Sequence, residues 1–298
     1  MYPKNGPRIA VVQFSPKFGQ VEANLIRAKE ICSGIKPRSV DLVCFPEMIL
    51  SGYVFEDSTE ILPYLEYPRT GPTSQMCADI AQRLQCYVVA GYPERLVDSD
   101  ETRNRDIGAN SAVLYGPSGE WIGNHRKINL FPTDRSWAKA GVGFQTFQLP
   151  PPIGRLSLGI CMDLNAHPPA DWQMRGPPHE IADYVLEQDV EILIFLNAWL
   201  DSEVYGYENE GIGGGVVDWT TVDFWAARLN PLWEKDSVDS GNGDKVTSVV
   251  VCNRTGKEKG RLFAGSSTCF NMRRGSGKPE VLDVMGRREE GFRIMYRA

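Results

Sequence analysis

The chain has 298 residues, of which 42% are hydrophobic and 23% are charged, and its formal net charge at pH 7 is −6. These values are ordinary for a globular protein, so they exclude bulk disorder and supply enough apolar material for a large core. The basic residues are scattered rather than gathered in a stripe, which argues against nucleic-acid binding. The longest apolar run, 192–200, contains Asn197 and is far shorter than the ~20 residues that a membrane-spanning helix needs.

The cysteines and the first residues indicate where the protein works. Seven cysteines occur at irregular spacing, and four of them lie inside apolar runs. An odd number in such surroundings favours buried free thiols in a reducing compartment over a disulfide framework. Residues 1–7 contain no apolar segment of the kind that a signal peptide needs. We therefore expect a cytoplasmic protein.

Short apolar runs alternate with helix-like segments through the first half of the chain. Runs rich in β-branched residues predict strands at 8–14, 41–45, 86–91, 110–115 and 120–124. Apolar residues that recur on one helical face predict helices at 20–32 and 73–84. The Pro-Ser-Gly sequence at 117–119 predicts a hairpin turn between the last two strands.

The second half repeats this order of elements. Strands are predicted at 155–160, 191–196, 247–252 and 266–271, and helices at 180–187 and 221–229. The alternation predicts a mixed α/β sheet covered by helices. Because no linker divides the sequence, we expect one domain over 1–298. The glycine-rich segment 206–217 is predicted to be a mobile loop.

Three reactive side chains, Glu47, Lys127 and Cys161, directly follow predicted strands or hairpins, where ligand sites of α/β sheets gather. Cys161 closes an apolar strand and precedes a turn, which would present its thiol beside backbone N–H groups. The alternative is a buried structural cysteine such as Cys252, and the local sequence favours neither. His167 follows six residues later, but the prolines after it predict a surface or turn histidine.

Glu47 has apolar neighbours on both sides, including Met48. A carboxylate in such surroundings must be paired or have a raised pKa, and a raised pKa suits a general base. A solvated residue at the start of a loop is the alternative. Lys127 is by itself a weak candidate, because a single lysine usually faces solvent.

The three residues together resemble a known family. The blocks FPEM, HRKINL and GICMD resemble the signature blocks of the nitrilase (carbon–nitrogen hydrolase) superfamily, in the same order. Their separations of 80 and 34 residues lie in the family's range. The opening RIAVVQFSPKFGQVEANL and the later ILIFLNAWL, CNRTG and AGSST are also similar, so the resemblance covers nearly the whole chain. It implies a single-domain α-β-β-α sandwich.

The resemblance also implies a mechanism through a covalent thioester. Glu47 would take the thiol proton, Cys161 would attack the amide carbon, and Lys127 with the backbone N–H of Met162 would stabilise the oxyanion. No metal or organic cofactor is needed. Many members carry a second glutamate shortly after the lysine, and Asp134 is its substitute here.

Within the superfamily, the blocks GICMDLN, CNRTG and AGSST most resemble the fungal protein N-terminal amidases. Those enzymes deamidate an N-terminal asparagine or glutamine, so the implied partner is a protein or peptide N-terminus. Its α-ammonium calls for an anionic group, and Asp163 and Asp134 are the candidates. A turn-capping role for Asp163 is equally favoured. Trp137 and Trp199 are predicted either to wall the pocket or to pack in the core.

Other functions remain open at this point. A small-molecule ω-amidase, which would prefer an arginine or lysine in its site, and an N-carbamoyl amide hydrolase belong to the same superfamily. An inactive binding scaffold is a third alternative, which the presence of all three reactive residues disfavours. The sequence leaves open the oligomeric state, the preference between asparagine and glutamine, and any extension beyond Ala298.

Overall fold

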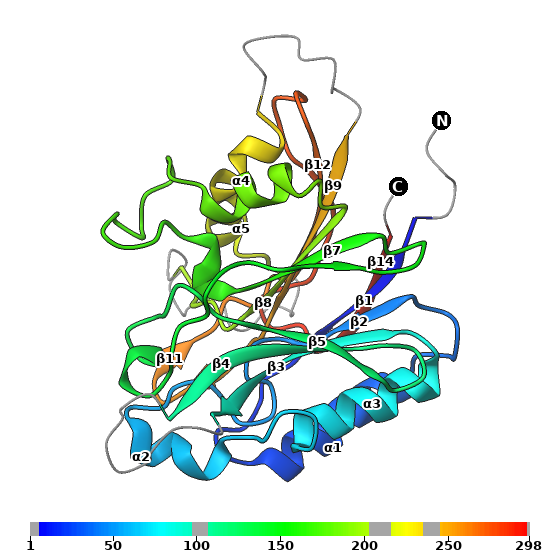
Figure 1. The fold of residues 1–298 in the computed structure, drawn as a ribbon, viewed down its shortest axis with the longest axis vertical. Helices are drawn as coiled ribbons and strands as arrows, with labels where there is room; N and C mark the ends of the chain where they lie inside the picture. The colour runs from blue at the N-terminus through cyan, green and yellow to red at the C-terminus, as the bar shows by residue number, and fades with distance from the viewer. Residues whose placement is uncertain (1–5, 97–106, 203–215, 235–244, 297–298) are drawn as a thin grey trace.

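The computed structural model describes residues 6–96, 107–202, 216–234 and 245–296. Most of the predicted mobile loop at 206–217 lies outside these ranges. Two six-stranded sheets form the centre of the molecule (Figure 1). In spatial order, the first sheet comprises β14 (Gly291–Tyr296), β1 (Arg8–Gln13), β2 (Leu42–Cys44), β3 (Tyr87–Arg95), β4 (Gly108–Tyr115) and β5 (Trp121–Arg126). The second comprises β13 (Glu280–Val284), β12 (Thr268–Arg273), β9 (Val246–Asn253), β8 (Ile192–Asn197), β7 (Arg155–Ile160) and β6 (Thr146–Gln148).

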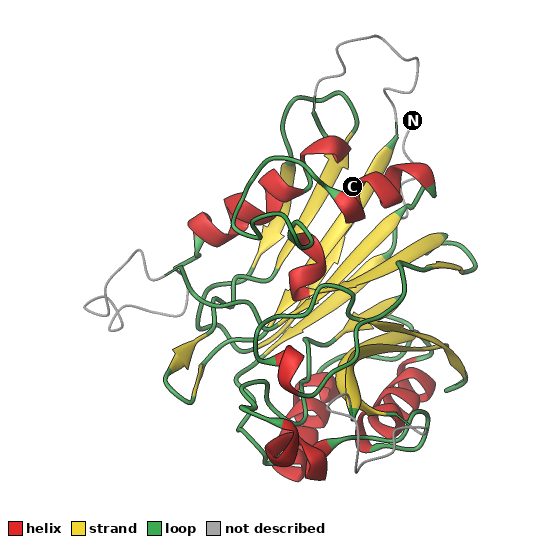
Figure 2. Cartoon of the chain, turned by 60° about the vertical axis from the view of Figure 1, so that its left-hand side comes forward, coloured by secondary structure: helices red, strands yellow, loops and turns green. Residues whose placement is uncertain are grey.

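Helices cover the outer faces of both sheets, as the ribbons show (Figures 1 and 2). The α-helices are α1 (Val21–Ser33), α2 (Ser58–Ile61), α3 (Pro72–Leu84), α4 (Glu180–Glu187) and α5 (Trp219–Arg228). The 3-10 helices are η1 (Leu62–Tyr64), η2 (Asp134–Ser136), η3 (Cys161–Leu164) and η5 (Asn230–Leu232). A small hairpin consists of β10 (Lys257–Glu258) and β11 (Arg261–Leu262). Since α1 and α3 pack on the first sheet and α4 and α5 on the second, the expected α-β-β-α sandwich is confirmed.

The central strands are apolar on both sides because both of their faces are buried. Along β1, Ala10 and Val12 contact the core under α1 and α3, whereas Ile9 and Val11 enter the core between the two sheets. Side chains of a strand alternate between its faces, so the unbroken apolar run supplies two cores at once.

The parallel strands of the two sheets position the residues that follow their carboxyl ends. In the first sheet β1, β2 and β3 run parallel, and in the second β7, β8 and β9 do. Glu47 follows β2 and Cys161 follows β7, so both residues come from the carboxyl ends of central strands. No helix among the described residues is long and apolar enough to cross a membrane.

Candidate active site

Glu47 lies on a loop held tightly against the first sheet. Strand β3 passes so close to this loop that a Cβ on Gly91 would lie 2.5 Å from the Glu47 Cα atom. The carboxylate is fully buried. Its Oε1 atom accepts hydrogen bonds from Lys127 Nζ and Asn110 Nδ2, both at 2.7 Å, and Oε2 accepts one from the Ala198 N–H at 2.7 Å. Burial raises the pKa of Glu47, although the Lys127 ammonium opposes the rise.

Lys127 lies between two carboxylates with no exposure to solvent. Its Nζ atom is 2.7 Å from Asp134 Oδ2 and 2.7 Å from Glu47 Oε1, and it lies 3.4 Å from the Tyr53 hydroxyl. Burial alone would lower the pKa of Lys127, but Asp134 and Glu47 outweigh that effect and raise it well above its usual value. The lysine is therefore held as an ammonium ion inside the protein.

Cys161 begins the 3-10 turn η3 at the end of β7. Its φ angle of 45° is unusual for a residue with a side chain, and such strain is typical of functional positions. The backbone N–H of Cys161 donates to Asn197 Oδ1 at 3.0 Å, which leaves the next amide, that of Met162, as the candidate oxyanion donor. Burial, and then the nearby Glu47 carboxylate, raise the pKa of the Cys161 thiol well above its usual value. The thiol consequently needs a base before it can act as a nucleophile.

Asp134 lies within this cluster rather than beside the space where a substrate fits. Besides the ion pair with Lys127, its carboxylate accepts hydrogen bonds from the Phe131 N–H and from Asn110 Nδ2. The sequence suggested Asp134 as the substitute for the second glutamate of the family, and its contact with Lys127 is consistent with that prediction. Because the turn of η2 brings its main chain close, the shorter side chain still reaches the lysine.

Asp163 does not lie where an anionic partner of the substrate α-ammonium would be needed. Its buried carboxylate is 3.0 Å from His125 Nε2, and it accepts hydrogen bonds from the N–H groups of Ile128, Asn129 and Ile160. Burial would raise the pKa of Asp163, but the His125 contact and these N–H groups outweigh it and lower that pKa. The residue ties the segment after Lys127 to the strand that carries Cys161, and it does not line the cavity.

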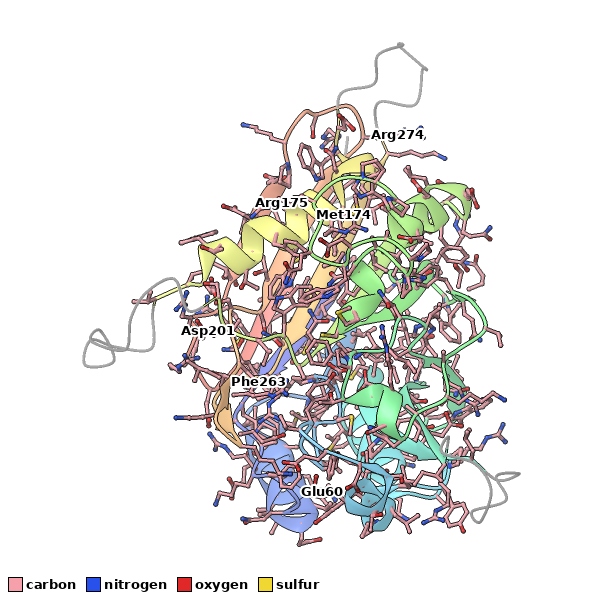
Figure 3. The ribbon with its side chains drawn as sticks, turned by 90° about the vertical axis from the view of Figure 1, so that its left-hand side faces the viewer. Glu60, Met174, Arg175, Asp201, Phe263 and Arg274 are labelled. Carbon is pink, nitrogen blue, oxygen red and sulfur yellow. The ribbon has the colours of Figure 1, made fainter. Side chains whose placement is uncertain are left out.

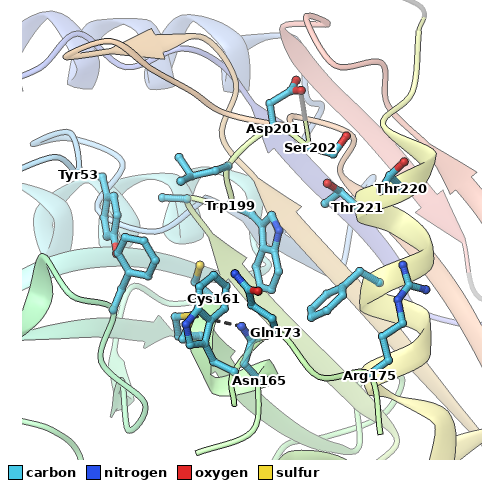
Figure 4. Close-up of a pocket in the computed structure, with 16 residues that line it drawn as sticks. Tyr53, Cys161, Asn165, Gln173, Arg175, Trp199, Asp201, Ser202, Thr220 and Thr221 are labelled. Carbon is cyan, nitrogen blue, oxygen red and sulfur yellow. Dashed lines mark hydrogen bonds between the residues drawn. The ribbon is translucent and has the colours of Figure 1, made fainter. Parts of the chain in front are cut away.

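A cavity of about 400 Å³ opens above Cys161 (Figure 4). This volume is typical of small-molecule sites. Five of its lining residues are aromatic, and Trp199, for which both a pocket wall and a core position were predicted, is one of them. The lining residues are Tyr53, Phe131, Cys161, Met162, Asn165, Trp172, Gln173, Arg175, Ala198, Trp199, Leu200, Asp201, Ser202, Thr220, Thr221 and Phe224.

Two other sequence candidates lie elsewhere. Trp137 is buried in a core with Met48 and Leu65, so it packs behind the site instead of walling the pocket. His167 packs against Phe144, with ring centroids 6.1 Å apart, and it does not line the cavity.

Sequence reasoning missed the polar residues that complete the cluster. Asn110 donates to the carboxylates of Glu47 and Asp134, and its signal was a polar residue at the start of a strand that ends in apolar residues. Tyr53 and Asn165 lie in loops with no periodic pattern, and although Asn165 ends the block GICMDLN, the sequence did not mark either of them as a site residue. Within the described part of the chain, no group of three or more histidine, cysteine, aspartate or glutamate side chains could hold a metal ion.

The family to which this site belongs follows from comparison with known proteins. Residues 8–167 match the carbon–nitrogen hydrolase family, and the chain therefore belongs to that family. A protein N-terminal amidase from Schizosaccharomyces pombe is 30% identical over 283 residues, which cover 90% of this chain and 92% of the relative. One from Saccharomyces cerevisiae is 31% identical over 216 residues, which cover 65% of this chain and 45% of the relative.

Solved structures agree with the fold. A crystal structure of an N-terminal amidase aligns with a TM-score of 0.79 at 22% identity, covering 97% of each chain. The structure of an N-terminal amidase with an Asn-Glu-Ala peptide aligns with a TM-score of 0.80 at 21% identity, covering 98% of each chain. The resemblance inferred from the sequence is thus confirmed.

Proposed function

We propose that this carbon–nitrogen hydrolase removes the side-chain amide of an N-terminal asparagine or glutamine from proteins or peptides and releases ammonia. The observation that carries the proposal is the buried Glu47–Lys127 pair beside Cys161 at the base of an open cavity. The choice of substrate is supported by the N-terminal amidase with which the chain aligns over nine tenths of its length.

The reaction would proceed in two halves. Glu47 takes the thiol proton while the Cys161 sulfur attacks the amide carbon, and the oxygen of that amide becomes an oxyanion. The Lys127 ammonium and the Met162 N–H stabilise it, each contributing roughly 3–4 kcal/mol if well placed. As the carbon–nitrogen bond breaks, Glu47 returns the proton to the leaving group, so that ammonia departs and a thioester remains.

Water completes the second half. Glu47 accepts a proton from a water molecule as the water attacks the thioester, and the Cys161 sulfur leaves and recovers its proton. The product is an N-terminal aspartate or glutamate. We propose that this occurs in the cytoplasm, where the new acidic N-terminus would mark a protein for an N-terminal degradation pathway.

A second candidate is the hydrolysis of a small ω-amide that carries a carboxylate. One observation favours it, namely that Arg175 lines the cavity, with its guanidinium carbon 5.8 Å from the centre of the Phe224 ring. A cation of this kind could bind a substrate carboxylate. Figure 3 shows Arg175 and Asp201 on the face turned toward the viewer, and both residues line the cavity.

Ammonia release tests the two candidates directly. The substrates are a peptide that begins with asparagine or glutamine, its N-acetylated twin, and a small ω-amide with a carboxylate, with Cys161→Ala as the control. We expect release from the free-amine peptide and background rates in the variant. Turnover of the small ω-amide in place of the peptide would establish the second candidate instead.

A further inference from the structure

The cavity offers no obvious counterion for the α-ammonium of the proposed substrate. Of the described residues that line it, Asp201 alone carries a carboxylate. That carboxylate points away from Cys161 in Figure 4 and is paired with Arg287 at 3.2 Å and Arg288 at 3.1 Å. Asp163 and Asp134 do not line the cavity, so neither provides this contact.

Among the described residues that line the cavity, Asn165 has a buried side-chain oxygen without a hydrogen-bond partner. Its side chain lines the cavity, the residue has 0% exposure, and its Oδ1 atom is buried with no hydrogen-bond partner. An unpaired buried acceptor is costly and uncommon in a folded protein, which points to a ligand donor that fills it. The amide nitrogen of the same side chain faces the Met162 sulfur at 3.2 Å, and this contact orients the oxygen.

The main chain of Asn165 is fixed to the turn that carries the nucleophile. Its N–H donates to the Met162 carbonyl at 2.9 Å, and its carbonyl accepts from Asn129 Nδ2 at 3.4 Å. Asn165 and Cys161 lie close together on this turn in Figure 4. The acceptor and the thiol therefore keep a constant separation, as recognition of a group near the scissile amide requires.

The substrate has the matching donor. In an N-terminal asparagine, three bonds separate the amide carbon from the α-nitrogen, and its three N–H groups must be satisfied when they leave water. We propose that Asn165 is the specificity residue for the free N-terminus, and that its Oδ1 atom accepts a hydrogen bond from the α-ammonium. The ring of Trp199, which also lines the cavity, supplies a face for the rest of the cation. This inference rests on the proposed function.

The test compares a peptide beginning with asparagine with its desamino twin, in which hydrogen replaces the α-ammonium. We expect Asn165→Leu to lower kcat/KM for the free-amine peptide by about 10- to 100-fold, as the loss of a charge-assisted hydrogen bond would. Its kcat/KM for the desamino twin should fall much less, so that the preference of the enzyme for a free amine shrinks. Asn165→Asp should restore the preference, because a carboxylate oxygen can accept the same bond.

The other outcomes would contradict the inference, and one of them would also contradict the proposed N-terminal specificity. Equal losses on both twins would assign Asn165 to the scissile amide or to the turn, and a preference that survives undiminished in Asn165→Leu would overturn the inference while leaving the proposed function intact. A wild-type enzyme that hydrolyses both twins equally would overturn the N-terminal specificity and the inference together. The desamino rate reports folding within the same variant, and Asn230→Leu, at a surface asparagine paired with Glu234, is the matched control.

Discussion

The charges of Glu47, Lys127 and Asp134 explain how a carboxylate can act as a base deep inside this protein. An isolated buried carboxylate would become neutral, whereas one paired with an ammonium keeps its charge. Lys127 is shared between two carboxylates at equal distances of 2.7 Å, so it only partly offsets the effect of burial on Glu47. The pKa of Glu47 consequently stays above its ordinary value, which suits a group that must both take and return a proton.

The pH dependence of kcat/KM should reflect the raised pKa of Glu47. Because Glu47 must be ionised and its pKa is raised, we expect the acid limb of the kcat/KM profile to lie above the usual glutamate value of about 4.5. In Asp134→Asn the removal of a nearby negative charge should lower the pKa of Glu47 and move that limb to lower pH. Loss of an ion-pair partner of Lys127 should also reduce kcat by about 10- to 100-fold.

Steady-state kinetics of peptide deamidation from pH 4 to pH 9 would measure both effects. The control is Asp79→Asn, which removes a surface carboxylate paired with Lys29 and should leave the profile unchanged. An acid limb that stays in place or moves to higher pH in Asp134→Asn would mean that Asp134 does not act on Glu47 through its charge.

At the scale of elements, the loop after β2 takes its shape from the strand beside it. The Gly91 N–H of β3 donates to the Pro46 carbonyl, and the Ile49 N–H donates back to the Gly91 carbonyl. This close approach is possible because residue 91 has no side chain. The backbone of Glu47 is thus positioned by main-chain contacts, and its side chain is then aimed by Asn110 and Ala198.

Gly91→Ala should disturb the site through this contact. The added Cβ would lie 2.5 Å from the Glu47 Cα and 2.7 Å from the Met48 nitrogen, both backbone atoms that cannot rotate away. We expect a loss of about 1–3 kcal/mol in the free energy of unfolding, together with a lower kcat. Urea denaturation and peptide kinetics would measure these changes. Gly143→Ala, where nothing lies within 4 Å of the new Cβ, should alter neither, and equal behaviour of the two variants would contradict the prediction.

Sequence patterns predicted the central strands because these strands are buried on both faces and therefore consist mainly of apolar residues. The strand expected at 155–160 and the helix at 180–187 match β7 and α4 residue for residue. Of the edge strands, β5 was predicted at 120–124, whereas β13 and β14 were not, because β13 carries Glu280 and Asp283 and β14 follows a cluster of charged residues. The three reactive residues could be foreseen since each follows a strand. The surroundings of Asp163 could not, because its partner His125 comes from a different sheet.

At the scale of the whole molecule, the site exists only where the two sheets face each other. Glu47 and Lys127 come from the first sheet, and Cys161 and Ala198 follow strands of the second. The core between the sheets combines side chains from both, among them Leu158 of β7 and Val89 of β3. The packing of the two sheets therefore sets the distance between the base and the nucleophile.

The last described strand is part of that packing. Strand β14 pairs antiparallel with β1 over six residues, from Arg8 opposite Tyr296 to Gln13 opposite Gly291. Met295 on β14 is buried in the core between the sheets, whereas Val281 on β13, an edge strand of the other sheet, is 39% exposed. The two positions thus offer a comparison between edge strands that differ in burial.

Met295→Ala should cost about 2–5 kcal/mol of unfolding free energy, because it leaves a cavity between the sheets. Val281→Ala should change stability by less than about 0.5 kcal/mol, as an exposed substitution usually does. Urea denaturation of both variants measures the difference, and kcat for the peptide at a temperature below both transitions shows whether the site survives. Since β14 reaches the site only through the packing of the sheets, we expect stability to fall in Met295→Ala before activity does. A loss of activity in fully folded Met295→Ala would instead indicate that the sheets shift relative to each other when the Met295 side chain is removed from the core between them.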